Sequence, residues 1–188
     1  MLTYEPALAR VRQATPAPRT TPVRLHQALD LPLAKPIVAR MDLPRFDNAA
    51  VDGYALRVSP GPRPDANSHA GPLVLSVVGR AEAGRPFGGP VRAGCAVRIL
   101  TGAQIPRGAN AVVMQEHARR RRDRLVVERV PQAGQHLRRR GEDLTRGTRV
   151  LAAGARLRPQ EIALLAALGH RTVAVYQRPT VAILTTGN

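Results

Sequence analysis

The chain has 188 residues and a formal net charge of +16, and aromatic residues make up only 3% of it. This length is enough to bury a core as one domain or two small ones, and the scarcity of aromatics predicts a core of Val, Leu, Ile and Ala. Lys35 is the only lysine, so arginine supplies nearly all the positive charge. That charge favours anionic partners such as phosphates or nucleic acid.

Two absences exclude further classes of protein. Cys95 is the only cysteine, so the chain cannot form an internal disulfide, which predicts a reducing compartment and a buried, inert thiol. The sequence contains no run of about eighteen apolar residues, and it does not begin with a basic segment followed by an apolar one. We therefore expect a soluble cytoplasmic protein.

The first forty residues predict two short helices and a strand. Thr3 can cap a helix that continues to about Gln13, with apolar residues along one face. After a proline-rich segment, residues 23–29 predict a second brief helix and residues 37–39 a strand.

The middle of the chain predicts a small β domain. Residues 59–71, rich in Pro, Gly, Asn and Ser, predict a surface loop. Short aliphatic or β-branched runs separated by glycine-rich turns predict strands. These strands are expected at 54–58, 73–78, 95–100, 111–114 and 125–130.

The last part of the chain predicts one helix and two strands. Pro159 in the first turn and Gly169 at the end delimit a helix over residues 158–169. Apolar runs at 173–176 and 181–184 predict strands.

Residues 44–57 combine turn formers and carboxylates. Asp47 and Asn48 favour one turn, and Asp52 with Gly53 favours a second. These polar side chains would gather where a loop enters a strand, an arrangement that suits a hard cation or a set of hydroxyl and amine donors. The alternative is that both aspartates only cap turns.

Residues 99–116 predict a strand, a Gly-Pro loop and a second strand. Thr101 and the backbone amide of Gly102 would lie at a strand tip, where they can hold a phosphate. The alternative is an ordinary hairpin in which Thr101 is a turn residue.

Two arginine clusters have different contexts. Residues 119–122 lie between two predicted strands and favour a solvated hairpin tip. In residues 138–144 the arginine forks suit phosphate oxygens, and Glu142 and Asp143 could hold those forks or help to bind a metal. A salt-bridge cluster between domains is the equal alternative.

Three segments resemble signatures of one family. Residues 46–55 resemble the Phe-Asp-Asn-Ser-Ala-Met-Asp-Gly-Tyr-Ala signature of the MoeA family, the molybdopterin molybdenumtransferases that include the gephyrin E domain. Ala49 and Val51 are the two departures. Residues 101–113 are similar to Thr-Gly-Ala-x-x-Pro-x-Gly-Ala-Asp-Ala-Val-Val, with Asn110 in place of the aspartate.

The third segment, residues 138–144, resembles the family's Arg-Arg-x-Gly-Glu-Asp-Ile. Residues 28–34 lack the Gly-Arg pair that is usual before the first signature. The last eight residues resemble the strand and turn that open the family's third domain.

The resemblance implies an α+β fold. A mixed helix and strand first domain would comprise residues 1–43 and 139–177, with a small β-rich, barrel-like domain inserted at 44–138. Residues 178–188 would be the first strand of a truncated molybdopterin-binding α/β domain. The resemblance thus covers almost the whole chain but only the N-terminal half of a family member.

The resemblance also implies an activity, the insertion of molybdate into adenylylated molybdopterin with release of AMP. It implies a divalent cation such as Mg²⁺, a homodimer, and the molybdopterin adenylyltransferase as a candidate partner. Asp52, Asp143 and Thr101 would be catalytic, and Asp52 would also be a metal ligand. Substrate-binding roles would fall to Asp47, Asn48, Gly102, Arg140 and Glu142.

Two other functions remain open from the sequence. The chain could be a non-catalytic dimerisation or scaffold fragment, because the remaining domains of the family are absent from it. It could also be a basic β module that binds nucleic acid, although the few aromatic residues argue against base stacking.

Overall fold

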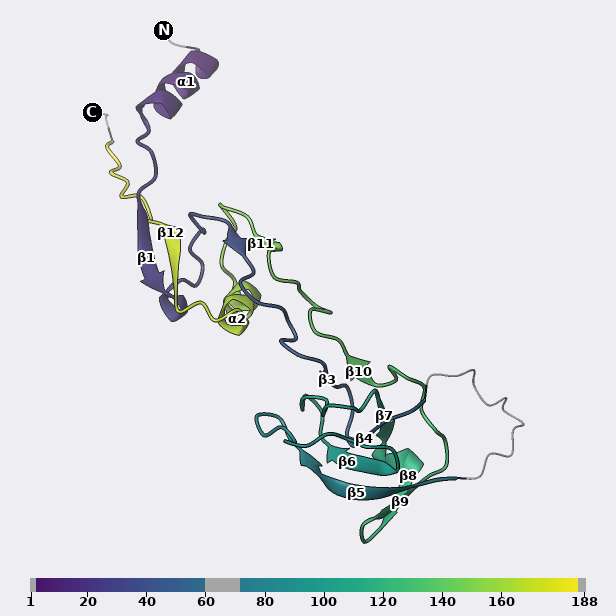
Figure 1. Cartoon of the computed structure of the whole chain (residues 1–188). Helices are drawn as coiled ribbons and strands as arrows, with labels where there is room; N and C mark the ends of the chain where they lie inside the picture. Colours follow the sequence, from purple (N-terminus) through teal and green to yellow (C-terminus); the bar gives the residue numbers. More distant parts are fainter. Residues whose placement is uncertain (1–2, 60–71, 186–188) are drawn as a thin grey trace. The chain divides into compact units, whose positions relative to one another are not determined.

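The computed structural model describes residues 3–59 and 72–185, which belong to two compact units (Figure 1). One unit combines Met1–Arg40 with Gly147–Asn188, and the other is Met41–Arg146. The first unit is therefore discontinuous in sequence, and the second is inserted into it.

The predicted N-terminal helix is present as α1 (Tyr4–Ala14). Glu5 in its first turn and Arg12 in its last turn suit the helix dipole. No residue of α1 is buried, and Val11 is 63% exposed. The apolar face expected of this helix is thus uncovered in the described chain.

A two-stranded antiparallel sheet pairs β1 (Thr20–Arg24) with β12 (Thr172–Tyr176), with Val23 opposite Val173. The helix expected over 23–29 is wrong at its start, because Val23 joins this sheet. Only the short 3₁₀ helix η1 (Leu25–Gln27) follows.

The rest of this unit consists of a second small sheet and one helix. The sheet pairs β2 (Ile37–Val38) with β11 (Arg149–Leu151), and the predicted helix is α2 (Pro159–Ala167). A carboxylate oxygen of Glu161 accepts the N–H of Arg158 at 2.9 Å, which caps the start of α2. The buried core contains Ala28, Leu33, Leu157, Leu165, Val173 and Val175.

The second unit is built on a six-stranded sheet in the order β7-β4-β6-β5-β9-β8, and Figure 1 shows its long β5 curving. All neighbours are antiparallel except β5 and β6, which are parallel. The strands are β4 (Gly53–Leu56), β5 (Leu73–Ala81), β6 (Cys95–Ile99), β7 (Ala111–Met114), β8 (Ala118–Arg121) and β9 (Arg124–Val127).

Two clusters of buried aliphatic side chains form the core of this unit. One gathers around Leu56, Leu75 and Leu125, and the other around Val97 and Ile99. Besides the sheet, β3 (Asn48–Ala49) pairs with β10 (Leu137–Arg138), and η2 (Gln115–His117) follows β7. The strands predicted at 73–78, 95–100 and 111–114 are thus confirmed, although β5 extends to Ala81. The strands predicted at 54–58 and 125–130 are present but shorter, and each begins one residue earlier.

The first arginine cluster is only partly a hairpin tip. Arg119, Arg120 and Arg121 lie in β8, an edge strand, and the turn itself contains Arg122 at φ 53°. Charged side chains on an edge strand block pairing with other chains. The surface loop expected at 59–71 lies almost wholly outside the described residues.

Two further expectations are wrong. The structure has no strand at residues 181–184, and Val181, Ile183 and Leu184 are 74%, 85% and 90% exposed. An apolar run forms a buried strand only beside a neighbour that satisfies its backbone groups, and the described chain supplies none there. Cys95 is half-buried at the start of β6 rather than buried. Within the described ranges, no helix is both long and apolar enough to cross a bilayer.

Candidate functional site

The second unit brings Asp52 and Thr101 into direct contact, although 49 positions separate them. Asp52 precedes β4 and Thr101 follows β6, and the antiparallel pairing of Gly53 with Ile99 places these two strand ends together. Asp52 Oδ1 accepts the Thr101 backbone N–H at 2.8 Å and its hydroxyl at 2.6 Å. The expected strand-tip position of Thr101 is therefore observed.

These contacts further stabilise the ionised form of Asp52. The Thr101 hydroxyl, then the Thr101 amide and the charge of Arg98 lower the pKa of this carboxyl from its ordinary value of 3.8. Asp52 is therefore an anion at neutral pH, unable to donate a proton and only weakly able to accept one. Such a carboxylate can hold a cation or position a donor group.

Arg98 connects this pair to two neighbouring elements and was not singled out from the sequence. Its guanidinium donates to Gly53 O at 3.0 Å and to Gln115 Oε1, and it lies 5.2 Å from the centre of the Tyr54 ring. The available signal was a single charge within the apolar run at 95–100, where a strand residue would otherwise be aliphatic.

A second group of contacts surrounds Asp47. Asp47 Oδ1 accepts the backbone N–H of Arg140, and its Oδ2 accepts the guanidinium of Arg139, both at 2.8 Å. The Arg140 amide, followed by the Arg139 side chain, lowers the pKa of Asp47. Asp47 therefore holds the arginine-rich segment against the first signature segment.

The remaining charges of residues 138–144 are also paired. Arg138 Nη2 donates to both carboxylate oxygens of Asp143 at 2.6 Å, and Glu142 Oε2 accepts the Arg139 backbone N–H at 2.7 Å. Arg140 Nε donates to Asp42 Oδ2 at 2.6 Å. All of these partners lie within Met41–Arg146, so this is an ion-pair network within one unit rather than between two.

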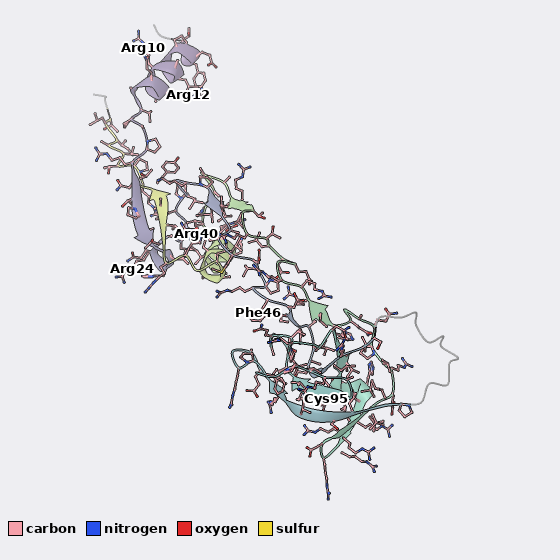
Figure 2. The ribbon with its side chains drawn as sticks, in the orientation of Figure 1. Arg10, Arg12, Arg24, Arg40, Phe46 and Cys95 are labelled. Carbon is pink, nitrogen blue, oxygen red and sulfur yellow. The ribbon has the colours of Figure 1, made fainter. Side chains whose placement is uncertain are left out.

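The remaining predicted residues serve the backbone of the same unit. The Gly102 amide donates to Ala49 O at 2.9 Å, so this amide is used within the fold. Asn48 is buried, lies in β3 opposite Arg138 of β10, and donates to Phe46 O at 3.4 Å. Figure 2 shows Phe46 on the second unit, and its side chain is 39% exposed.

The described residues contain no cluster of three or more His, Cys, Asp or Glu side chains that could hold a metal ion. Both hydrogen bonds that Asp52 accepts through its side chain use Oδ1, which leaves Oδ2 available to one ligand. One carboxylate oxygen fits Mg²⁺ only where substrate phosphates and water supply the other ligands.

The fold is similar to that of solved archaeal proteins. The molybdopterin biosynthesis moeA protein from Pyrococcus horikoshii OT3 matches with a TM-score of 0.76 and 41% identity, over 84% of this chain and 41% of that protein. A second structure of a Pyrococcus horikoshii moeA protein matches with a TM-score of 0.80 and 30% identity, over 95% of this chain and 45% of its own. The class is thus that of the sheet-rich MoeA structures.

The family model for the MoeA N-terminal region (domain I and II) matches residues 2–169, so the chain belongs to the MoeA family. The molybdopterin molybdenumtransferase of Haemophilus influenzae is 38% identical over 100% of this chain and 45% of its own length. The molybdopterin molybdenumtransferase 2 of Mycobacterium tuberculosis H37Rv is 37% identical over 90% of this chain and 41% of its own. The chain spans less than half the length of these relatives.

Proposed function

We propose that this chain forms the N-terminal part of a molybdopterin molybdenumtransferase, which inserts molybdate into adenylylated molybdopterin and releases AMP. Family membership and the names of the relatives support this function. The observation that carries it is the contact of Asp52 with Thr101, because two separate signature segments meet there through a carboxylate and a hydroxyl.

Asp52 has an electrostatic role in this proposal. The carboxylate is ionised at neutral pH, and its lowered pKa makes it a weaker base, so it anchors positive charge near the breaking phosphoanhydride instead of transferring a proton. Mg²⁺ bound there with substrate phosphates would neutralise the charge that develops on the leaving phosphate. Thr101 orients the carboxylate through two hydrogen bonds.

The arginine-rich segment has a positioning role. Asp143 holds Arg138 by two hydrogen bonds from one nitrogen, and Arg138 is a donor suited to phosphate oxygens. We assign Asp143 to the reaction through this arginine. Asp47, Asn48, Glu142 and the backbone of Arg140 keep the segment in place, and Gly102 shapes the turn after Thr101 at φ 78°.

The experiment uses a chimera in which these 188 residues replace the corresponding part of the Haemophilus influenzae relative. AMP release from adenylylated molybdopterin is measured with and without molybdate. Asp52→Asn should lower kcat by about 10²–10³-fold, as loss of one preorganised electrostatic group does. Asp123→Asn, in the exposed turn between β8 and β9, is the matched control and should leave kcat unchanged. Full activity of the Asp52→Asn chimera would contradict the electrostatic role assigned to Asp52.

Association into a homodimer in the cytoplasm is part of this proposal. The described N-terminal helix buries none of its residues, and Tyr4 is 75% exposed. Light scattering tests the homodimer by comparing the molar mass of the 188-residue chain with that of a Tyr4→Glu variant. If the 188-residue chain forms a dimer but the longer chimera does not bind adenylylated molybdopterin, the scaffold function is favoured instead.

A further inference from the structure

The long strand β5 shifts its register against β6 near its middle. Before the shift Val77 pairs with Ala96, and after it Arg80 pairs with Arg98. Residues 96 and 98 lie on the same face of β6, so the bulge brings Arg80 to the face that Val77 and Ala96 share. Without the extra residue, Gly79 would lie opposite Arg98.

Two arginines therefore stand side by side on neighbouring strands. Like charges directly opposite each other destabilise a sheet, so packing alone does not explain the arrangement. Glu82 balances Arg80 in part through an ion pair of 2.6 Å. Arg98 donates hydrogen bonds to two neutral groups, the carbonyl of Gly53 and the amide of Gln115, and its charge is balanced in part by Asp52 and Glu116, whose pKa values it helps to lower.

A hollow of about 500 Å³ lies at this point of the sheet. Its volume falls within the range of pockets that hold small molecules. No carboxylate lines it, and half of the lining residues are arginines. The lining consists of Val77, Val78, Gly79, Arg80, Arg98 and Arg120.

Arg120 contributes the third guanidinium from β8. Its Nε donates to Arg122 O at 2.7 Å, and its Nη2 lies 3.9 Å from Asp123 Oδ1. The arginines thus come from three strands, β5, β6 and β8, that are distant in sequence. Three arginines thus line one hollow, and a guanidinium group can donate paired hydrogen bonds to the oxygens of a phosphate group.

We propose that this hollow binds the phosphate group of a small organic phosphate through Arg80, Arg98 and Arg120. Apolar Val77 and Val78 contact the uncharged part of the ligand. Arg98 also holds the carbonyl of Gly53, directly after Asp52, so a bound phosphate is linked to the candidate site through one side chain. Binding of a phosphate in this hollow can be measured whether or not the chain takes part in the proposed transferase reaction.

The test titrates the 188-residue chain with inorganic phosphate, AMP and adenosine, and follows arginine side-chain and backbone NMR signals. Arg80→Gln and Arg120→Gln are compared with Arg121→Gln. Arg121 is exposed in β8 beside Arg120 and does not line the hollow. Arg121→Gln therefore removes the same positive charge as the other two variants without changing the hollow. Arg80→Gln and Arg120→Gln should each weaken AMP binding about tenfold, or about 1.4 kcal/mol, and Arg121→Gln less than about twofold.

The outcomes separate the sources of the phosphate. If AMP binds more tightly than inorganic phosphate and adenosine does not bind, the ligand is a nucleotide; equal binding of both phosphates shows that the phosphate group alone is recognised. If all three variants lose the same affinity for AMP, binding depends only on surface charge, and the proposal is overturned. Absence of saturable phosphate binding, or adenosine binding that matches AMP, would overturn it as well. Backbone amide spectra of the variants that overlay the wild-type spectrum exclude misfolding as the cause of a loss, and Arg80→Lys separates the contribution of the guanidinium fork from that of the charge.

Discussion

At the scale of residues, the candidate site depends on which groups hold each carboxylate. Asp52 and Asp47 look alike in the sequence as residues that form turns. In the structure Asp52 accepts from Thr101, whereas Asp47 accepts from Arg139 and Arg140. The first carboxylate keeps one oxygen available for a ligand, and the second is used by the fold.

Removing the Thr101 hydroxyl should raise the pKa of Asp52. That hydroxyl contributes most to the lowering of this pKa, so Thr101→Ala should move the carboxyl titration toward the ordinary value of 3.8, and Thr101→Ser should leave it in place. Carbon-13 NMR of the Asp52 carboxyl across the acid range measures both. An unchanged titration in Thr101→Ala would contradict the hydrogen-bond assignment.

The contribution of Asp47 to stability should depend on pH. The pKa of Asp47 is lower in the folded state than its ordinary value of 3.8, so its stabilising effect is present above that value and is lost as the pH falls through the folded pKa. Asp47→Asn should lower the free energy of unfolding by about 0.2–1 kcal/mol at neutral pH, as for other solvent-exposed ion pairs.

The measurement for Asp47 is urea unfolding of wild type and variant at several pH values. The difference in free energy of unfolding should shrink as the pH falls below 3.8. Asp123→Asn controls for the loss of one surface charge. A difference that grows toward low pH would show that the sign is wrong.

At the scale of elements, close approach of strands positions the candidate site. A Cβ atom at Gly53 would lie 1.9 Å from Val113 O of β7, a backbone atom that cannot move aside alone. The glycine predicted from the sequence as a turn former is thus also required in the strand β4. It lets β4 pack between β6 and β7 directly after Asp52.

Gly53→Ala should destabilise the chain by about 1–3 kcal/mol, the usual cost of overpacking. Gly88→Ala is the matched control, because a Cβ at Gly88 would meet no atom within 4 Å. Thermal unfolding by circular dichroism compares the two variants. Equal melting temperatures for Gly53→Ala and wild type would show that β4 and β7 can separate without loss.

At the scale of the whole molecule, each unit contains its own buried core. Both aliphatic clusters of the six-stranded sheet consist of residues within Met41–Arg146. The other cluster consists of residues from the first and last parts of the chain. The chain leaves the first unit after Arg40 and returns to it at Gly147. These two positions are close together, because Ala39 O accepts the Gly147 N–H at 2.8 Å and the Ala39 N–H donates to Thr148 O at 2.9 Å.

Residues 41–146 should therefore fold alone. Their backbone amide NMR spectrum should overlay that of the full chain, apart from signals near the two ends. Replacing the same segment by a Gly-Ser linker of about four residues, a length typical of hairpin loops, should leave the first unit folded. Unfolded spectra for both fragments would show that the units stabilise each other.

The sequence by itself determined most of the element types and the signature segments. The periodicity of apolar residues, the capping residues and the glycine-rich turns located α1, α2 and most strands, because these signals act over a few neighbouring residues. The resemblance led to the MoeA family, which the family model confirms. The strand predicted at 181–184 was wrong because a strand requires a partner, which local sequence does not supply.

Only the tertiary structure decided how distant residues meet. The pairing of β4 with β6 places Thr101 against Asp52, and the pairing of β3 with β10 accompanies the ion pairs of Asp47. One extra residue in β5 places Arg80 beside Arg98, which no pattern of composition predicts. Register between strands is set by cross-strand hydrogen bonds and packing over the whole sheet, so it is a property of the folded chain and not of any one segment.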